Sequence, residues 1–300
     1  MDTIVVTGAS GNVGGEIARI LLASGKGVRA VARDGGKLAP LAAKGAEARA
    51  GDLGDISFLK EALRDASAAF VMIPPPAPTT TDFRGYQRRM AGVIAGALKA
   101  AGVRRAVALS SVGAEVPEGT GPIKGLHDFE KTLAEVTGLE LVVMRPAWFM
   151  ENHLMSIGLI QATGMNGGAI RGDLPFSEVA TRDIAAFAAA ALADSSRKSE
   201  VRYLLGPRDW TLEEASKVLG AAIGKPELAY IAFPYEQVKA ALMQTGLSGE
   251  IASTYVEMGQ AFNEGRIRAE RTPEATTPTP LEEFAKTTFA PAFRLAGHAA

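Results

Sequence analysis

The stretch GLHDFEK at residues 125–131 places His127 four positions before Lys131, a spacing that puts both side chains on one face of a helix. Imidazole titrates near neutral pH, so His127 could give a proton or a hydrogen bond to a substrate carbonyl. It could also line a pocket without exchanging protons, or satisfy backbone groups at the start of the helix. A lysine cation one turn away would lower the imidazole pKa. Asp128 and Glu130, which lie between the two, are expected on a solvated face.

A glycine series in the stretch TGASGNVGG is the second group suited to chemistry, with Gly8, Gly11 and Gly14 three residues apart. It follows an apolar run and precedes an amphipathic one, which predicts a strand-to-helix turn. There Gly8 permits the tight bend, Gly11 lets the backbone approach a pyrophosphate, and Gly14 lets helix and strand pack closely. The free N–H groups of the helix then face the phosphates. We therefore expect this turn to bind a dinucleotide.

The end of the second apolar run bears on which dinucleotide binds. Folds that bind NAD place an acid there, about 20 residues past the glycines, to hold the ribose hydroxyls. This chain has Arg33 followed by Asp34, with Lys37 one turn further on. Arg33 could bind a 2′-phosphate through two parallel hydrogen bonds; alternatively, Arg33 is solvated and Asp34 binds the ribose. We favour NADP(H) over NAD(H), and expect Asp52 either at the adenine edge or in a turn.

The elements that must position these residues alternate along the first half of the chain. Each strand–helix–strand unit takes about 30 residues, as in parallel βαβ sheets. Strands this apolar indicate a sheet covered by helices on both faces. The predicted class is therefore α/β, a doubly wound parallel sheet of the Rossmann type. The expected strands are 3–8, 28–33, 46–52, 68–74, 105–111 and 139–146, and the expected helices are 12–24, 36–43, 56–64, 82–101 and 124–137.

The alternation weakens after about residue 150, which predicts a smaller C-terminal α/β lobe. Residues 1–155 would form the NAD(P)-binding domain and residues 156–300 the substrate-binding lobe. Parts near 178–206 would pack back on the Rossmann sheet. They include a helix expected at 181–194, with Thr181 as its N-cap candidate.

Composition and charge exclude several function classes. The net charge of −1 argues against capture of nucleic acid or an anionic membrane, and the absence of cysteine rules out disulfides, thiolate catalysis and cysteine metal sites. Three histidines show no metal-ligand spacing, so no metal is expected. The N-terminus lacks signal-peptide features, and the apolar run at 184–193 is far shorter than the roughly 18 residues of a membrane span. We expect a cytoplasmic protein, monomeric or homodimeric, that takes a small-molecule acceptor.

Several motifs, taken in order, resemble one family. TGASGNVG, Arg33, GDL, FVMIPP, LSSVGA and RPAWFMEN resemble the NmrA-like branch of the atypical short-chain dehydrogenases/reductases over at least residues 1–155, and LEEFAKTTF at 281–289 resembles that family's closing segment. The resemblance implies a Rossmann domain with a small substrate lobe. It also implies one of two functions. Some members reduce quinones, azo dyes or related conjugated acceptors with NAD(P)H, and others are redox sensors that act through protein partners.

Carbonyl-reducing short-chain dehydrogenases carry Tyr-x-x-x-Lys on the helix that holds His127 here, and the lysine lowers the tyrosine pKa. The tyrosine is absent from that helix. A Tyr-x-x-x-Lys at Tyr235 to Lys239 is expected in the second lobe, where we interpret it as a coincidence. Without the phenol, alcohol–ketone interconversion and sugar epimerisation are disfavoured. Hydride transfer to a quinone or dye does not require a strong positioned acid, because the acceptor can take its proton from water or a weak donor.

The candidate site residues follow the carboxyl ends of the predicted strands. The catalytic candidates are His127, Lys131 and Ser110. The resemblance puts a substrate-orienting serine at the end of the fifth strand, where Ser110 and Ser111 stand, and a cap or turn is the alternative for each. The acceptor pocket is expected at Trp148, Phe149, Met150 and Asn152, a cluster that could equally be the core joining the lobes. The expected cofactor-binding residues are Gly8, Ser10, Gly11, Asn12, Val13, Arg33, Asp52, Leu53, Ile73, Pro74 and Pro146.

These observations together predict an NADPH-dependent reductase of small apolar conjugated acceptors, with quinones as the leading class. The alternative is a catalytically silent NAD(P) sensor that acts through a protein partner.

Overall fold

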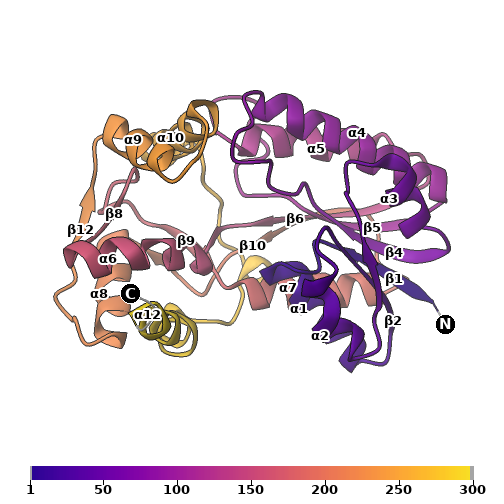
Figure 1. Cartoon of the computed structure of the whole chain (residues 1–300), viewed down its shortest axis with the longest axis horizontal. Coiled ribbons are helices and arrows are strands. Elements are labelled where there is room, and N and C mark those ends of the chain that lie inside the picture. Colours follow the sequence, from indigo (N-terminus) through magenta and orange to yellow (C-terminus); the bar gives the residue numbers. More distant parts are fainter. Residues whose placement is uncertain (1, 298–300) are drawn as a thin grey trace.

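The computed structural model describes residues 2–297, which form two lobes side by side (Figure 1). The first lobe is built on a seven-stranded sheet in the order β10-β6-β5-β4-β1-β2-β3, with every neighbouring pair parallel. Helices cover both of its faces, α3, α4 and α5 on one and α1, α2 and α7 on the other. The predicted α/β class with a doubly wound parallel sheet is confirmed.

The elements of the first lobe run as follows: β1 Thr3–Thr7, α1 Asn12–Ala23, β2 Gly27–Ala32, the 3₁₀ helix η1 Gly36–Leu38, α2 Ala39–Ala42, β3 Glu47–Ala50, α3 Ile56–Ala62, β4 Ala66–Val71, α4 Phe83–Ala101, β5 Arg105–Leu109, α5 Ile123–Ala134 and β6 Glu140–Pro146.

Two elements from the second half of the chain complete this lobe. Strand β10 (Glu200–Leu204) pairs with β6 at the edge of the sheet, and helix α7 (Thr181–Ala193) packs on α1. Thr181 was expected to be the N-cap of α7, but the cap is Ala180 in extended conformation. The carboxylate of Glu151 replaces a side-chain cap, because it accepts hydrogen bonds from both Thr181 N (3.1 Å) and Thr181 Oγ1 (2.6 Å). The domain division at residue 155 stays a prediction.

Alternating side chains along the central strands build two separate cores. In β1, Ile4 and Val6 join the core that includes Ile17 of α1 and Ile184 of α7. Val5 points to the opposite face and joins the core under α3, α4 and α5. Both faces of the central strands are thus buried, as their near-continuous apolar runs predicted, whereas the edge strand β3 is exposed along its length.

The second lobe consists of two small sheets, β11-β9-β7 and β12-β8, with helices around them. Its elements are β7 Trp148–Phe149, η2 Met150–Ser156, α6 Ile157–Thr163, β8 Asn166–Gly168, β9 Phe176–Val179, β11 Asp209–Trp210, α8 Leu212–Ala222, β12 Tyr230–Ala232, α9 Tyr235–Gln244, α10 Gly249–Asn263, η3 Pro273–Ala275, α11 Leu281–Phe284, the π-helical η4 Ala285–Phe289 and α12 Ala290–Gly297.

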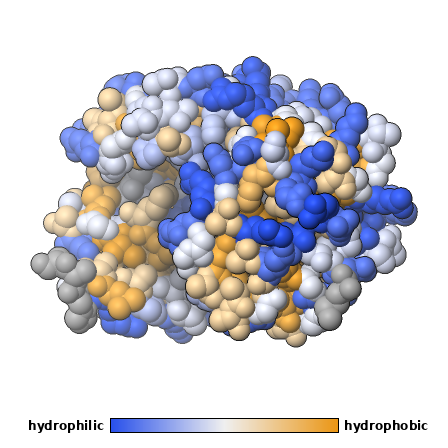
Figure 2. Space-filling view, turned by 45° about the vertical axis from the view of Figure 1, so that its right-hand side comes forward, coloured by the Kyte–Doolittle hydropathy of each residue, from blue (hydrophilic) through white to orange (hydrophobic). Residues whose placement is uncertain are grey.

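The helical hairpin α9–α10 reaches back to the loops of the first lobe (Figure 1). Ser248 donates its hydroxyl to Thr80 O (2.5 Å), and Lys124 pairs with Glu257 (2.9 Å). Figure 2 shows the molecule hollowed below this hairpin, with apolar side chains gathered along the lower rim. Tyr235, the tyrosine of the Tyr-x-x-x-Lys sequence, lies on α9 in the second lobe, and its hydroxyl accepts a hydrogen bond from Asn263 (2.8 Å).

Within residues 2–297, no helix has the length and the apolar character that crossing a membrane requires.

Candidate functional site

The glycine turn between β1 and α1 leaves the start of the helix bare of side chains. Gly8 has a left-handed backbone (φ +64°), and Gly11 N donates to Gly8 O at 2.9 Å. A Cβ on Gly14 would lie 2.5 Å from Gly8 O, so the turn can approach the helix this closely only because that position is glycine. No side chain caps α1, and its first turn holds no acid. The free N–H groups of the helix therefore suit an anionic pyrophosphate.

A pocket of about 150 Å³ opens beside this turn at the carboxyl edge of the sheet. Seven residues predicted to bind the cofactor line it together: Gly8, Ser10, Gly11, Arg33, Asp52, Leu53 and Pro74. Ala32, Met72, Pro75 and Tyr86 complete the lining and were not predicted. The other predicted cofactor residues lie around it: Asn12 is exposed at the start of α1, Ile73 is half-buried, and Val13 and Pro146 are buried.

The charged residues after β2 differ in their hydrogen bonds. Asp34 accepts a hydrogen bond from Gly36 N (2.9 Å) within its own turn. Arg33 is exposed in the pocket and makes no hydrogen bond or ion pair with another residue of the described chain. Asp52 likewise closes a turn through Gly54 N (2.9 Å), as one of its two interpretations expected; it also lines the pocket, and its contact with the adenine edge stays a prediction. A free guanidinium at this place leaves the pocket suited to an additional anionic group.

Tyr86, in the first turn of α4, is a wall of this pocket that the sequence motifs did not reveal. Its hydroxyl donates to Pro74 O at 3.0 Å, which ties the loop after β4 to the helix. Burial raises the pKa of the phenol, while Arg33 and Asp52 act on it in opposite directions. The phenol therefore stays a neutral donor at physiological pH. A tyrosine on a helix otherwise predicts only packing, so no sequence signal distinguished it.

His127 occupies α5 as predicted, and its imidazole is held by one hydrogen bond. Nδ1 lies 2.7 Å from Ala114 O, in the loop between β5 and α5. Because a carbonyl oxygen only accepts, Nδ1 carries the hydrogen in the neutral ring and Nε2 keeps a lone pair. Lys131 is exposed and makes no hydrogen bond or ion pair elsewhere in residues 2–297. The structure thus fixes the histidine but does not tie the lysine to it.

Ser110 and Glu130 form a largely buried network that was not predicted from the sequence. Ser110, 4% exposed, donates its hydroxyl to Glu130 Oε1 at 2.5 Å. Arg145 binds both oxygens of the same carboxylate, Nε to Oε1 at 3.0 Å and Nη2 to Oε2 at 2.6 Å. The expectation that Glu130 lies on a solvated face was wrong, because its side chain is 12% exposed and paired with Arg145. Burial favours a lower pKa for Arg145, but Glu130 and Tyr203 outweigh it and raise the pKa.

Asp128 is also paired rather than solvated. It accepts hydrogen bonds from Arg84 Nε (2.9 Å) and Arg88 Nε (2.8 Å), both on α4. Burial favours a higher pKa for this carboxyl, but the two arginines outweigh it and hold the pKa below its usual range. Helices α4 and α5 are therefore joined by an ion-pair cluster on the outer side of the site.

The aromatic cluster after β6 lies where the two lobes meet. The ring of Trp148 stands edge-on to Phe176 (6.1 Å between centroids) and to Phe262 (5.7 Å), which come from β9 and α10. Phe149 and Asn152 are half-buried. Met150, expected in the acceptor pocket, is fully buried in the core of the second lobe. The structure therefore divides the predicted cluster, with Met150 in the core and the aromatic residues between the lobes.

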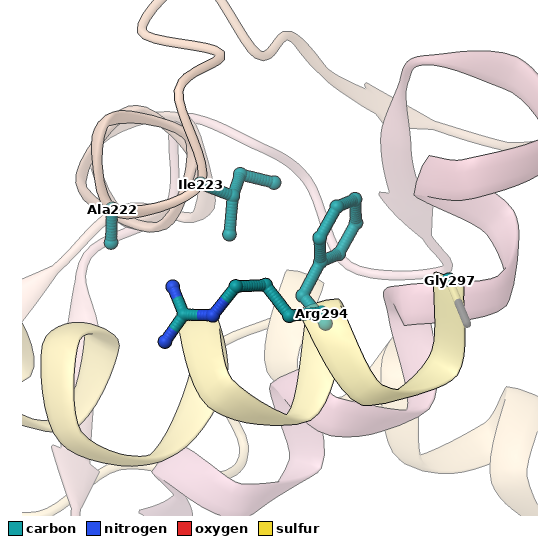
Figure 3. Close-up of a pocket in the computed structure, with 5 residues that line it drawn as sticks. Ala222, Ile223, Arg294 and Gly297 are labelled. Atoms are coloured by element: carbon teal, nitrogen blue, oxygen red, sulfur yellow. The ribbon is translucent and has the colours of Figure 1, made fainter.

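A second hollow, about 310 Å³, lies in the second lobe between α8 and α12 and contains none of the predicted residues. Figure 3 shows Ile223 and Arg294 reaching into it from these two helices. No group of three His, Cys, Asp or Glu in the described part of the chain is placed to hold a metal ion.

Comparison with protein families identifies the group to which this site belongs. The model of the NmrA-like family matches residues 1–285, nearly the whole chain. The chain belongs to the NmrA-like family. The resemblance found in the motifs is thereby confirmed, and so is the expectation of a Rossmann fold with a small C-terminal lobe.

The NmrA-like relatives include NAD(P)H-dependent oxidoreductases. The chain is 29% identical to the NAD(P)H azoreductase of Xenophilus azovorans, over 85% of each chain. It is 31% identical to the (4-alkanoyl-5-oxo-2,5-dihydrofuran-3-yl)methyl phosphate reductase of Streptomyces griseus, over 80% of each. The NADPH-dependent quinone oxidoreductase of Escherichia coli, at 24% identity, superposes with a TM-score of 0.77 over 98% of this chain and 99% of that one, which shows a shared fold.

Proposed function

We propose that the chain is an NADPH-dependent reductase of small apolar conjugated acceptors of the quinone or azo type. The observation that carries this proposal is the pocket at the carboxyl edge, where a bare helix start lies beside Arg33, which has no ion-pair partner in the described part of the chain. When bound, the reduced nicotinamide supplies a hydride. The acceptor then needs one proton to complete a two-electron reduction.

The choice of NADPH over NADH rests on Arg33 and Asp34. Asp34 uses Oδ1 in its own turn with Gly36, whereas the Arg33 guanidinium lines the pocket without a hydrogen-bond or ion-pair partner in residues 2–297. An anionic 2′-phosphate would supply that partner through charge-assisted hydrogen bonds. The bare start of α1 would hold the pyrophosphate, and Tyr86 would form one wall of the adenosine end.

The class of acceptor is supported by the relatives and by the apolar joint between the lobes. The azoreductase and the quinone oxidoreductase act on conjugated acceptors, as their names state. In this chain Trp148, Phe176 and Phe262 bring aromatic rings to the place where the carboxyl ends of the strands meet the second lobe. Flat apolar molecules suit such surroundings.

Proton supply is the step for which this chain lacks the usual phenol. His127 replaces it on α5, with Nδ1–H bound to Ala114 O. The neutral ring therefore offers only a lone pair at Nε2, and only the protonated ring can donate there. A conjugated acceptor that can also take its proton from water tolerates this arrangement.

The test is anaerobic consumption of NADPH and of NADH by the purified protein with a panel of quinones and azo dyes. We expect turnover with NADPH in preference to NADH. His127→Phe is assayed alongside: lost turnover with intact cofactor binding would assign the proton donor to His127, and retained turnover would assign the proton to water.

Tight cofactor binding with no turnover for any acceptor would refute the reductase and favour the redox sensor. Such a sensor must bind the oxidised and reduced cofactor with unequal affinity, which a fluorescence titration measures directly.

A further inference from the structure

A single carboxylate, Glu130, links two of the three residues that the sequence predicts as catalytic, Ser110 and His127. It faces Ser110 and lies one helical turn from His127 on α5. Both carboxylate oxygens of Glu130 accept hydrogen bonds from the Arg145 guanidinium, and Oε1 also accepts the hydrogen of Ser110. Since the pair is largely buried, little solvent competes for these bonds.

Arg145 extends the network to a third element. Its Nη1 donates to Tyr203 OH (2.9 Å) on β10 and lies 3.3 Å from Glu115 Oε2, in the loop between β5 and α5. That loop starts at Ser110, which is bound to Glu130, and carries Ala114 next to Glu115. The loop is therefore attached to the Glu130–Arg145 pair at two points, Ser110 and Glu115.

Both partners of the His127 hydrogen bond are consequently held by the same ion pair. His127 belongs to the helix that Glu130 anchors, and Ala114 belongs to the loop that Ser110 and Glu115 anchor. The direction of two hydrogens follows from this arrangement. The Ser110 hydrogen points to Glu130, and the neutral-state hydrogen of His127 is on Nδ1.

We propose that Glu130 is a positioning residue of the acceptor site. Paired with Arg145, it takes the Ser110 hydrogen and aligns the His127–Ala114 bond. Ser110 can then only accept a hydrogen bond, and Nε2 of His127 stays free for the acceptor, to which the protonated ring can donate. This inference rests on the proposed reductase function. It reverses the role that the resemblance assigns to Ser110, since a serine whose hydrogen is bound to Glu130 cannot orient a substrate by donating to it.

The test reads the histidine directly and turnover separately. The tautomer of His127 is measured by ¹⁵N NMR of histidine-labelled protein, at a pH above which the ring nitrogen signals change no further, with the signal assigned by its loss in His127→Phe. Wild type should show hydrogen on Nδ1. Glu130→Gln should show a mixture of tautomers and a kcat roughly tenfold to a hundredfold lower, with the KM for NADPH changed by less than about twofold.

Two further variants keep the outcome decisive. Glu135→Gln makes the same chemical change at an exposed position just after α5 and should alter neither readout. Ser110→Ala removes one anchor of the loop without leaving a buried charge, and should shift the tautomer in the same direction by less. It therefore serves if Glu130→Gln does not fold.

An unchanged His127 tautomer in both Glu130→Gln and Ser110→Ala would overturn the positioning role, whatever the activity. A wild type that locks the tautomer through Glu130 but reduces no acceptor would instead refute the proposed function and leave the network standing.

Discussion

Replacing Gly14 by alanine should damage the cofactor site more than its small size suggests. An added Cβ would lie 2.5 Å from Gly8 O, 2.8 Å from Gly8 C and 2.9 Å from Thr7 O. All three are backbone atoms, so no side chain can rotate away and the turn or the helix must move. Inserting a methyl group into packed structure typically costs about 1–3 kcal/mol. Alanine's better helix propensity returns about 0.5–1 kcal/mol of this.

The larger effect is expected on binding. Gly8 and Gly11 line the pocket, and the same movement that relieves the clash displaces them from each other and from the start of α1. A loss of about 1.4 kcal/mol in binding already corresponds to a tenfold weaker affinity. We therefore expect NADPH to bind Gly14→Ala at least about tenfold more weakly, measured by titration of nicotinamide fluorescence.

Gly92→Ala on α4 is the matched control, because a Cβ there meets no atom within 4 Å. It should leave NADPH affinity unchanged and raise the free energy of unfolding by about 0.5–1 kcal/mol in urea titrations. Gly14→Ala should lower that free energy. Wild-type NADPH affinity in Gly14→Ala would refute the assignment of this turn to the cofactor, even if the variant were less stable.

Three further predictions address the cofactor choice, a helix cap and the ion-pair cluster. Arg33→Ala should weaken NADPH binding about tenfold to a hundredfold, as expected for loss of charge-assisted hydrogen bonds. The affinity for NADH should change by less than about threefold. Equal losses of affinity for both cofactors would contradict the 2′-phosphate role. Glu151→Gln should lower the free energy of unfolding by about 0.5–2 kcal/mol in urea, since it weakens the cap on Thr181; an unchanged midpoint would exclude that role. Asp128→Asn should lower the free energy of unfolding by about 1 kcal/mol at pH 7, because it removes the ion pairs with Arg84 and Arg88. The folded pKa of Asp128 lies below its unfolded value of about 3.9, so the unfolded chain binds more protons between the two values. The difference in free energy of unfolding between wild type and Asp128→Asn should therefore persist above about pH 5 and shrink as the pH falls below about 4. A difference that shrinks towards alkaline pH would contradict this sign.

The sheet and the cofactor turn could be predicted because both depend on local patterns. Apolar runs of five to seven residues separated by amphipathic stretches determine a parallel sheet with few alternatives. The three glycines are required by backbone geometry within one turn, which spacing alone expresses. Arg33 was found for the same reason, since it directly ends a strand.

The small C-terminal lobe could be predicted only in outline. Its strands are two to four residues long, too short for a reliable period, and its two small sheets pair segments that lie far apart in the chain. Met150 shows what the sequence could not predict. It belongs to an apolar cluster after β6, and nothing in the sequence distinguishes a residue that faces a ligand from one that enters the core.

The error at Glu130 had a signal in the sequence that points to a general rule. His127 is followed by two polar residues one turn further along the helix, Glu130 after three positions and Lys131 after four, and helical spacing places both near the histidine's face. What decides between them lies on β6, where Arg145 ends an otherwise apolar run, LVVM. A charged residue in a buried strand needs a buried partner of opposite sign. The helix that packs beside β6 offers Glu130, so pairing the charges would have turned Glu130 inwards and Lys131 outwards from the sequence alone. Charged residues within apolar strands should be paired first, because they determine which face of the neighbouring helix holds the chemistry.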